Sequence, residues 1–315
     1  MLGSRAEIDS SARTERIPGG GETTTHRYSL LLIAMSVFAA ALVLTRAARA
    51  QRTEVEWDGP PETWHWNIPD EIPGFIHSTI HSQAMVRTVG YNIWLPPSYA
   101  VEAARHYPVV YYLHGASGSE RSALEFGDIV RDAVAAGRIG DVIYVFPNGG
   151  HFSRYRDWKA ANVKAETLII EELIPRIDET YRTIADREGR ALCGWSMGGG
   201  GAIRFALKYP EMFCAAASMA AAIGWQSEDG GDLTASDYAE KNAEAVRTRT
   251  KLMLVCGEDD GLFSRHELFL GLLDALVIPY TFEAYDGVGH DLGSLKTLAG
   301  AKIAEMLARS YAEAR

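Results

Sequence analysis

The sequence predicts an α/β fold in which helices cover both faces of a mainly parallel sheet. Two observations point to this class. Short apolar runs rich in Val, Ile, Tyr and Ala end at glycine or proline, as buried strands do. Amphipathic stretches with helical spacing separate many of these runs, and strands that alternate with helices form parallel sheets. The 315 residues, 47% of them hydrophobic, are enough for a sizeable core.

The expected elements follow one another after residue 74. Segments typical of strands are 88–97, 107–115, 141–150, 190–196, 212–220, 251–260 and 280–287. Segments typical of helices are 166–181, 199–210, 265–277 and 294–314. A proline inside the first helical segment predicts a kink, because proline removes a backbone donor. With no internal repeat in the sequence, we expect one domain over residues 74–315.

The first fifty residues have a different character. Residues 29–44 are apolar apart from Ser36, and Ala48-Arg49-Ala50 resembles a signal-peptide cleavage site. Sixteen residues are short for a membrane span, so we expect 1–50 to be a disordered leader with a cleaved signal peptide, and the protein to be secreted or periplasmic. Arginines follow the apolar run, which favours the alternative of a membrane anchor through 29–44.

Two further segments depart from the regular alternation. Residues 51–73 form an extension rich in Trp and Pro, which we expect to pack as irregular structure against the domain. Residues 224–247 are polar and acidic, and they predict a solvated excursion with one helix at the edge of the sheet.

Charge and cysteine content exclude several classes of partner. The net charge of −10 argues against nucleic acid and anionic membrane surfaces. Cys193, Cys214 and Cys256 lie in or beside apolar runs, so we expect small buried side chains without disulfides. His77 and His81 have the spacing of metal ligands but fall in a strand-like stretch. We therefore expect no metal and no cofactor.

The stretch 193–201, "CGWSMGGGG", carries the strongest functional motif. Residues 194–198 fit G-x-S-x-G, and they lie between a predicted strand and a predicted helix, where this motif exposes a nucleophilic serine on a strained turn. Side chains two residues before and after Ser196 would collide across such a turn, which explains Gly194 and Gly198. The alternative of a phosphate-binding loop lacks the Lys-Ser or Lys-Thr that would follow it.

A serine nucleophile needs a base, and the base needs an acid that orients it. In this arrangement the acid and then the histidine follow the serine along the chain. Asp260, at the end of the predicted strand 251–260, and His290, before the last predicted helix, are the candidates. The adjacent Asp259 remains an alternative to Asp260.

The reaction also needs donors for a developing oxyanion and a pocket for the substrate. We expect the backbone amides of Met197 and Ala116 to supply the oxyanion hole. His114 is expected to form structural hydrogen bonds rather than to act as a second base. The aromatic side chains considered for the substrate pocket, each with core or rim packing as the alternative, are Tyr155, Trp158, Trp195 and Trp225.

These segments together resemble the putative-esterase (esterase D-like) family of α/β-hydrolases, which includes feruloyl and acetylxylan esterases. The resemblance covers about residues 76–308 through "NIWLPPSY", "YPVVYYLHG", "EELIPRIDETY", "GWSMGGGGAIRFALKYPEMF", "CGEDD" and "GVGHDLGSLK". It implies an α/β-hydrolase fold, Ser196 as nucleophile, His290 as base and Asp260 as its orienting acid. The acidic segment 224–247 and the Trp-rich residues 56–74 depart from the family pattern and leave the substrate preference open.

The expected function is that of an exported serine carboxylesterase, which hydrolyses carboxylic esters, carbohydrate-linked or feruloyl esters among them, through an acyl-enzyme. An acyltransferase that uses a sugar hydroxyl in place of water is the first alternative. A non-catalytic binding protein on the same scaffold is the second, and the complete set of serine, acid and histidine argues against it.

Overall fold

The computed structural model describes residues 60, 61, 63–158, 161–224 and 233–314. The expected leader over 1–50, with the apolar run 29–44, lies outside the described residues, so its cleavage stays a prediction. Within the part that is described, no helix is both long enough and apolar enough to cross a membrane.

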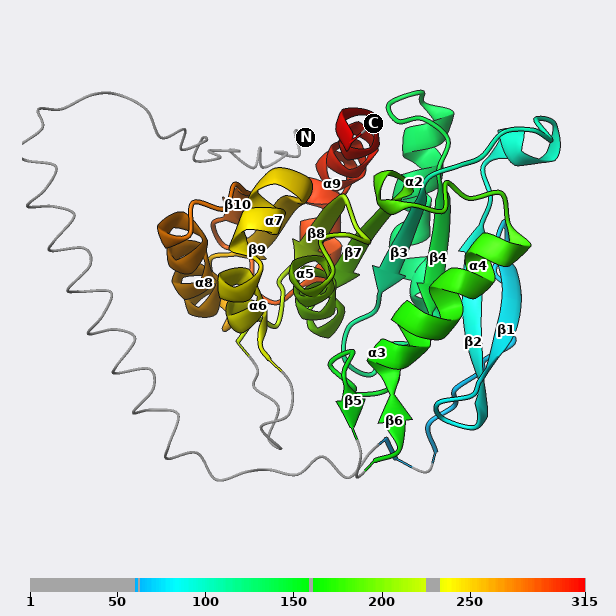
Figure 1. The fold of residues 1–315 in the computed structure, drawn as a ribbon, viewed down its shortest axis with the longest axis horizontal. Helices are drawn as coiled ribbons and strands as arrows, with labels where there is room; N and C mark the ends of the chain where they lie inside the picture. The colour runs from blue at the N-terminus through cyan, green and yellow to red at the C-terminus, as the bar shows by residue number, and fades with distance from the viewer. Residues whose placement is uncertain (1–59, 62, 159–160, 225–232, 315) are drawn as a thin grey trace, which may run out of the picture. The chain divides into compact units, whose positions relative to one another are not determined.

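A mainly parallel sheet of eight strands forms the centre of the described residues (Figure 1). Its strands are β1 (Ile76–Ser82), β2 (Arg87–Trp94), β3 (Val109–Leu113), β4 (Ile143–Pro147), β7 (Arg190–Trp195), β8 (Ala215–Met219), β9 (Lys251–Gly257) and β10 (Thr281–Tyr285). They pair in the order β1-β2-β4-β3-β7-β8-β9-β10. Among the eight strands of this sheet, β2 runs in the direction opposite to the other seven. A separate hairpin pairs β5 (Asp157–Trp158) with β6 (Val163–Lys164).

Helices connect the strands and pack on both faces of the sheet (Figure 1). They are α2 (Ala123–Ala135), α3 (Ala165–Thr167), η3 (Leu168–Leu173), α4 (Ile174–Thr180), α5 (Met197–Lys208), α6 (Ala235–Lys241), α7 (Ala243–Arg249), α8 (Phe263–Ala275) and α9 (Leu292–Ala314). Short 3₁₀ turns are η1 (Pro97–Ala100), η2 (Glu120–Ser122) and η4 (Arg187–Gly189). In the helical segment 165–180, the wider π turns of η3 precede Pro175, where the missing amide disturbs the regular hydrogen bonds.

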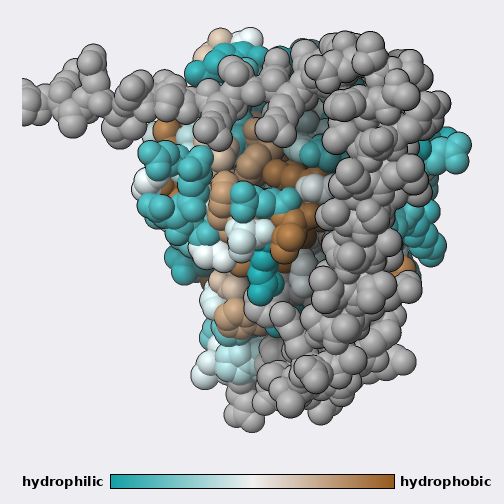
Figure 2. All heavy atoms as spheres, turned by 90° about the vertical axis from the view of Figure 1, so that its left-hand side faces the viewer, coloured by the Kyte–Doolittle hydropathy of each residue, from teal (hydrophilic) through white to brown (hydrophobic). Residues whose placement is uncertain are grey.

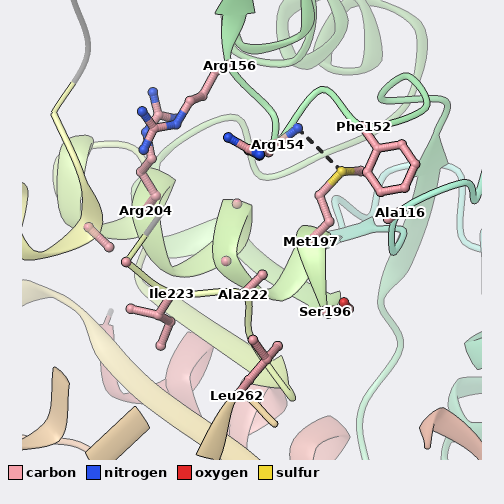
Figure 3. Close-up of a pocket in the computed structure, with 14 residues that line it drawn as sticks. Ala116, Phe152, Arg154, Arg156, Ser196, Met197, Arg204, Ala222, Ile223 and Leu262 are labelled. Carbon is pink, nitrogen blue, oxygen red and sulfur yellow. Dashed lines mark hydrogen bonds between the residues drawn. The ribbon is translucent and has the colours of Figure 1, made fainter. Parts of the chain in front are cut away.

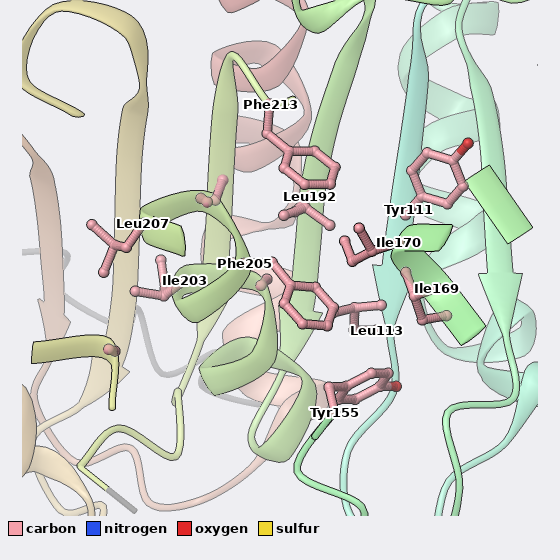
Figure 4. Close-up of a cluster of buried hydrophobic side chains, with 14 of the residues drawn as sticks. Tyr111, Leu113, Tyr155, Ile169, Ile170, Leu192, Ile203, Phe205, Leu207 and Phe213 are labelled. Atoms are coloured by element: carbon pink, nitrogen blue, oxygen red, sulfur yellow. The ribbon is translucent and has the colours of Figure 1, made fainter. Parts of the chain in front are cut away.

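Side chains on the two faces of each central strand belong to two separate hydrophobic clusters. Along β3, Tyr111 and Leu113 belong to the cluster that contains α5, shown in Figure 4. Val110 and Tyr112 point to the other face and belong to the cluster that contains α2 and α9. This alternation follows from the two-residue period of a strand and explains why β3 is apolar throughout.

Helix α9 shows how one stripe of side chains fixes a helix to the sheet. Its buried residues include members spaced four apart, which a helix places along one face: Leu295, Ala299, Ile303, Leu307 and Tyr311. Each buried Leu or Ile side chain contributes about 1.5–3 kcal/mol. The Tyr311 hydroxyl also donates to the Val109 carbonyl at 3.1 Å, which ties the end of α9 to the start of β3.

The surface beside α8 mixes hydrophilic and hydrophobic residues. Figure 2 views the molecule from the side that carries this helix, and hydrophilic residues surround a smaller hydrophobic group. Leu268 in α8 and Val277 just after it are exposed. Scattered exposed apolar side chains of this kind are normal on folded proteins.

The structure confirms the predicted sheet and corrects one segment. All seven predicted strand segments contain a strand, and β1 occupies the strand-like stretch around His77 and His81. The expectation of a solvated excursion with one helix over 224–247 is wrong for the described residues 233–247. They form α6 and most of α7, whose inner faces bury Tyr238 and Val246 because apolar residues recur at helical spacing there. Helix α2 was not predicted.

The extension before β1 packs on the domain without helix or strand in its described part. Ile72 is buried. Trp66 lies against Gly150, where an added Cβ would approach its ring to 2.7 Å. The carbonyl of His65 accepts a hydrogen bond from the Asn148 side chain at 2.9 Å. The three cysteines are buried and free, as expected.

Candidate active site

Three residues that are far apart in the sequence meet where strands β7, β9 and β10 end. His290 Nε2 lies 2.9 Å from Ser196 Oγ, and His290 Nδ1 lies 2.7 Å from Asp260 Oδ2. A neutral imidazole between a hydroxyl and a carboxylate carries its proton on Nδ1 and accepts through Nε2. The arrangement can therefore remove the proton from the Ser196 hydroxyl.

Ser196 occupies a strained turn between β7 and α5. Its φ of 52° and ψ of −113° put a residue with a Cβ in the left-handed half of backbone space, which costs on the order of 1–3 kcal/mol. Hydrogen bonds hold the turn from both sides: the Ser196 amide donates to the Met219 carbonyl at 2.9 Å, and the Ala222 amide donates to the Ser196 carbonyl at 2.8 Å.

The glycines around Ser196 are required by close contacts between backbones. A Cβ on Gly194 would lie 2.4 Å from the Gly198 carbonyl, and a Cβ on Gly198 would lie 1.9 Å from the Leu113 carbonyl. Both distances are far below van der Waals contact. The first confirms the expected collision across the turn, whereas the second is a contact with strand β3. Gly200 allows α5 to lie close to the loop after β8, because a Cβ added at this position would lie 2.5 Å from the Ala222 carbonyl.

The two candidate carboxylates differ sharply in their surroundings. The Asp260 side chain is 1% exposed, and its second oxygen accepts from the Leu262 amide at 2.8 Å. Asp259 is exposed, and its backbone amide donates to the Val288 carbonyl at 3.0 Å. The structure therefore brings Asp260, and not Asp259, to the histidine.

His290 is held between the acid and an aromatic ring. Its side chain is 41% exposed, so it faces the entrance of the site. The Trp195 ring packs against it with centroids 4.5 Å apart and planes tilted by 32°. Gly115 leaves room for this tryptophan, since a Cβ there would lie 2.5 Å from Trp195 Cδ1. Trp195 therefore positions the imidazole.

Met197 and Ala116, the residues expected to supply the oxyanion donors, both lie next to the serine. Met197 is the first residue of α5, and an amide at this position has no acceptor within its own helix. Ala116 follows β3, and both residues line the same cavity as Ser196. An oxyanion formed at Ser196 would also meet the partial positive charge of the α5 N-terminus. The oxyanion-hole role of these two amides stays a prediction.

His114 fixes the loop that carries Ala116. Its Nε2 accepts from the Gly149 amide at 2.9 Å, and its Nδ1 lies 2.7 Å from the Gly115 carbonyl. Burial lowers the pKa of His114 to about 4, so the ring stays neutral near pH 7. These bonds join the ends of β3 and β4, which is the structural role expected for this histidine.

A cavity of about 280 Å³ opens beside Ser196 (Figure 3). Its lining is Ala116, Phe152, Arg154, Arg156, Ser196, Met197, Gly200, Gly201, Arg204, Ala222, Ile223, Gly224, Ala235 and Leu262. Figure 3 shows Met197 next to Ser196 and the Phe152 ring beside the Met197 sulfur, which accepts a hydrogen bond from the Arg154 amide at 3.3 Å.

The three described aromatic residues that were expected in the pocket do not line this cavity. Tyr155 is fully buried beneath Gly201, and its hydroxyl donates to the His114 carbonyl at 3.3 Å. Trp158 is buried, and its indole nitrogen donates to the Ser153 carbonyl at 2.7 Å. Trp195 packs on His290. Trp225 lies outside the described residues.

A family model matches most of the central part of the chain. The model described as Putative esterase covers residues 82–276, which include Ser196 and Asp260. The chain belongs to the Putative esterase family.

Individual relatives agree with this family. An esterase of Mycobacterium tuberculosis is 38% identical over 133 residues, or 41% of this chain and 28% of that protein. An endo-1,4-beta-xylanase/feruloyl esterase of Xylanibacter ruminicola is 35% identical over 130 residues, or 39% of this chain and 18% of that protein. The matched region spans less than a third of either relative.

Solved structures show the same architecture. A ferulic acid esterase superposes with a TM-score of 0.68 at 28% identity, over 75% of this chain and 98% of that one. The ferulic acid esterase Fae1A of Anaeromyces mucronatus shares the fold at 21% identity, with a TM-score of 0.60 over 82% of this chain and 98% of that one. This member of the Putative esterase family therefore has the α/β-hydrolase fold.

Sequence reasoning missed the charged wall of the cavity. Arg154 and Arg156 lie in the loop after β4, and Arg204 lies on α5. A partial signal was present: the motif helix carries an arginine two turns after the serine, on the same side. Nothing in the sequence indicated that the loop after β4 would meet it.

A buried ionic network anchors Arg204. The Glu166 carboxylate accepts from Arg204 and from the Tyr209 hydroxyl, and Lys208 Nζ lies 2.6 Å from it. Burial alone would raise the pKa of Glu166, but the charge of Arg204 and the hydrogen bonds outweigh it and leave the pKa lowered. Glu166 is therefore ionised near pH 7 and holds the guanidinium in place.

No candidate metal centre is present among the residues that the structure describes, since none of their His, Cys, Asp and Glu side chains form a group of three or more that could hold an ion. His77 instead lies 3.8 Å from the buried Glu120.

Proposed function

We propose that this protein is a serine carboxylesterase with Ser196, His290 and Asp260 as its catalytic residues. The observation that carries the proposal is the continuous hydrogen-bond chain from the Ser196 hydroxyl through His290 to the buried Asp260, at the mouth of a cavity. The family and its esterase relatives support ester hydrolysis as the reaction.

In the first half of the reaction, Ser196 Oγ attacks the ester carbonyl carbon while His290 Nε2 takes the hydroxyl proton. The carbonyl oxygen becomes an oxyanion, which the amides of Met197 and Ala116 stabilise. Asp260 stabilises the imidazolium that forms. Collapse of the intermediate breaks the bond to the leaving alcohol, which takes the proton from His290, and the acyl group remains on Ser196.

In the second half, water attacks the acyl-enzyme. His290 takes a proton from the water, the second tetrahedral intermediate collapses, and the proton returns to Ser196 as the acid leaves. The products are one alcohol and one carboxylic acid, and the enzyme is regenerated. Every proton transfer runs through His290, so no cofactor is needed.

We propose small-molecule esters as the substrates, and feruloyl or carbohydrate-linked esters as the first to be screened. The names of two relatives, a feruloyl esterase at 35% identity and a ferulic acid esterase at 28%, support that choice. Product analysis with and without a sugar acceptor shows how much of the acyl group is transferred to water and how much to the sugar.

Labelling with a fluorophosphonate tests the nucleophile. We expect the label on Ser196, its loss in Ser196→Ala and His290→Ala, and a fall of kcat by roughly 10⁴–10⁶ in Ser196→Ala. Ser294→Ala, at an exposed serine of α9, is the matched control and should label normally. Undiminished turnover by Ser196→Ala, or a label on another residue, would sink the assignment.

We further propose that the chain is exported and cleaved before Gln51. The apolar run 29–44 and the small residues Ala48 and Ala50 support this. Mass measurement of the protein from the extracellular or periplasmic fraction should give a chain that begins at Gln51. A full-length chain recovered in the membrane fraction would instead establish the anchor.

A further inference from the structure

The loop that carries Ala116 has a strained backbone and needs support from its surroundings. It spans residues 114–119, between β3 and η2. Ser117, directly after Ala116, has a φ of 61°, a left-handed conformation that residues with a Cβ rarely adopt. Both residues are exposed, so the protein core does not hold them in place. Contacts from other segments therefore decide where the Ala116 amide points.

On one side, His151 holds the loop 114–119. The Ser117 amide donates to the His151 carbonyl at 2.9 Å, and Ser117 Oγ lies 3.0 Å from His151 Nε2. The ring of Trp64, from the extension before β1, packs edge-on against the His151 ring with centroids 5.0 Å apart. The extension thus supports the histidine that is bonded to the loop.

On the other side, Glu120 anchors the end of the loop. Its side chain is completely buried although it is ionisable. One carboxylate oxygen accepts a hydrogen bond from the Ile68 amide of the extension, and the other accepts from Asn148 Nδ2 at 2.8 Å. Gly90 makes room for it, since an added Cβ would lie 2.2 Å from Glu120 Oε1. The interior tolerates such a carboxylate because donors face it.

The Asn148 side chain links the extension, the buried carboxylate and the loop after β4. Its Nδ2 also donates to the His65 carbonyl at 2.9 Å, and its Oδ1 accepts from the amide two residues later at 3.2 Å. A carbonyl only accepts and a backbone amide only donates, so these two partners fix the orientation of the Asn148 side chain. The next residue, Gly149, donates to His114 Nε2 at the start of the loop 114–119. Both ends of that loop are therefore tied to two consecutive residues.

These contacts come from a part of the chain that precedes the region matched by the family model. Residues 64–68 lie before the matched residues 82–276, so membership of the family does not by itself account for the contacts. The Gly90 amide donates to the Trp66 carbonyl at 2.7 Å, which ties the extension to β2. The extension is therefore fixed to the sheet midway between its two contacts with the supports of the loop.

We propose that residues 64–68 of the extension support the active site, and that Glu120 and His151 are positioning residues that hold the Ala116 amide toward the oxyanion. This inference rests on the proposed esterase function and names residues that assist the same site. Removal of an oxyanion donor slows an enzyme by about 10²–10³, and a donor that is displaced stabilises the oxyanion less. A weaker support of the loop therefore gives a slower reaction.

Glu120→Gln tests the support at its buried end. A glutamine offers one acceptor and one donor, whereas the Ile68 and Asn148 groups that face it are both donors, so one hydrogen bond must be lost. We expect kcat/KM for p-nitrophenyl acetate, per active site counted by fluorophosphonate labelling, to fall about tenfold or more. Glu172→Gln, in η3, is the matched control, because its carboxylate also accepts from a backbone amide, that of Ala84, at 2.9 Å. This variant should keep the wild-type value.

Two further readouts distinguish positioning from a general loss of structure. Hydrogen–deuterium exchange should become faster in peptides that span 114–119 and 148–150, and should stay at the wild-type rate in α8. The pH dependence of kcat/KM should keep its midpoint while its plateau falls, because His290 keeps its contacts with Ser196 and Asp260. An equal increase of exchange over the whole chain would instead indicate a destabilised protein.

Trp64→Leu is a second, milder variant that decides the question if Glu120→Gln is destabilised throughout. The indole nitrogen is buried and has no hydrogen-bond partner among the residues that the structure describes, so the change removes ring contacts alone. We expect faster exchange over 114–119 and a several-fold lower kcat/KM. Wild-type exchange over 114–119 in every folded variant would overturn the proposal, and so would a wild-type kcat/KM in every folded variant.

The failure of this proposal and the failure of the esterase function give different results. If wild type cleaves the acetate and the folded variants match it, the esterase assignment stands and the support of the loop fails. If wild type cleaves no ester, the esterase function fails, and the exchange measurement alone decides whether the extension holds the loop.

Discussion

Asp259 and Asp260 are chemically identical neighbours, and only their environments assign them different roles. The chain turns sharply after β9, which sends one carboxylate into the protein and the other into solvent. The buried one accepts from both Leu262 and His290, so its charge is held by fixed donors. The sequence contains both residues after the same strand and therefore could not distinguish them.

We expect Asp260→Asn to lower kcat on p-nitrophenyl acetate by about 10⁴, because an amide cannot hold the imidazole in the required tautomer. Asp259→Asn changes an exposed side chain and should leave kcat close to wild type. Both variants keep the side-chain volume, so neither opens a cavity. A larger loss in Asp259→Asn than in Asp260→Asn would reverse the assignment.

At the scale of the elements, the junction of β7 and α5 is built on backbone contact. Strand β3 and the loop after β8 approach α5 so closely that a single methyl group at Gly198 would meet the Leu113 carbonyl at 1.9 Å. Backbone atoms cannot move aside as a flexible side chain can. The glycine therefore sets the distance between the nucleophile turn and the loop that carries Ala116.

We expect Gly198→Ala to destabilise the protein by about 1–3 kcal/mol or more, as overpacking does, and to lower kcat by displacing the Met197 amide. Gly271→Ala, in α8, is the matched control: nothing lies within 4 Å of its added Cβ, and it should stabilise by roughly 0.5–1 kcal/mol. Urea unfolding measures both. Equal stability of the two variants would contradict the contact argument.

The elements that sequence patterns located were those with a clear apolar period and a glycine or proline at the end, such as β3 and α5. Helix α2 escaped because its buried face includes Gly127, which lowers helix propensity yet is needed where Phe75 packs. Helix α6 had a readable start, since Thr234 and Asp237 form a capping box, but its acidic setting suggested a solvated excursion with one helix rather than two packed helices.

The candidate site, like the fold, could be predicted only in part from the sequence. Ser196 and His290 followed from a local motif and from chain order. The pocket did not, because Tyr155 and Arg154 are adjacent in sequence and point in opposite senses, one into the core and one into the cavity. Which of the two side chains enters the cavity depends on the backbone conformation of the loop after β4. Its positive φ angles at Arg154 and Tyr155 are held by tertiary contacts, which the sequence does not reveal.

For the molecule as a whole, buried neutral histidines couple the fold to pH. His114 has a pKa lowered to about 4 by burial, and burial also lowers the pKa of His266. An unfolded chain takes up a proton on each near pH 6.5. Between that pH and the folded pKa the unfolded state binds more protons, so the free energy of unfolding must fall as pH falls. The pKa of Glu166 is lowered in the folded protein, so this residue reduces the free energy of unfolding further only below about pH 4.5.

The window between pH 6.5 and pH 5 isolates the histidines, because most carboxylates stay ionised there. We expect His114 alone to remove about 2 kcal/mol of unfolding free energy from wild type across this window. His114→Gln should be less stable at pH 7, since the Gly149 amide loses its acceptor, but its stability should fall less steeply, with His266 and His151, whose pKa values burial also lowers, supplying the remainder. His81→Gln, at an exposed position, should retain the wild-type slope.

Urea unfolding of the three proteins at both pH values gives the change in unfolding free energy with pH. A change in His114→Gln as large as in wild type would show that the buried imidazole does not control the acid sensitivity of the fold.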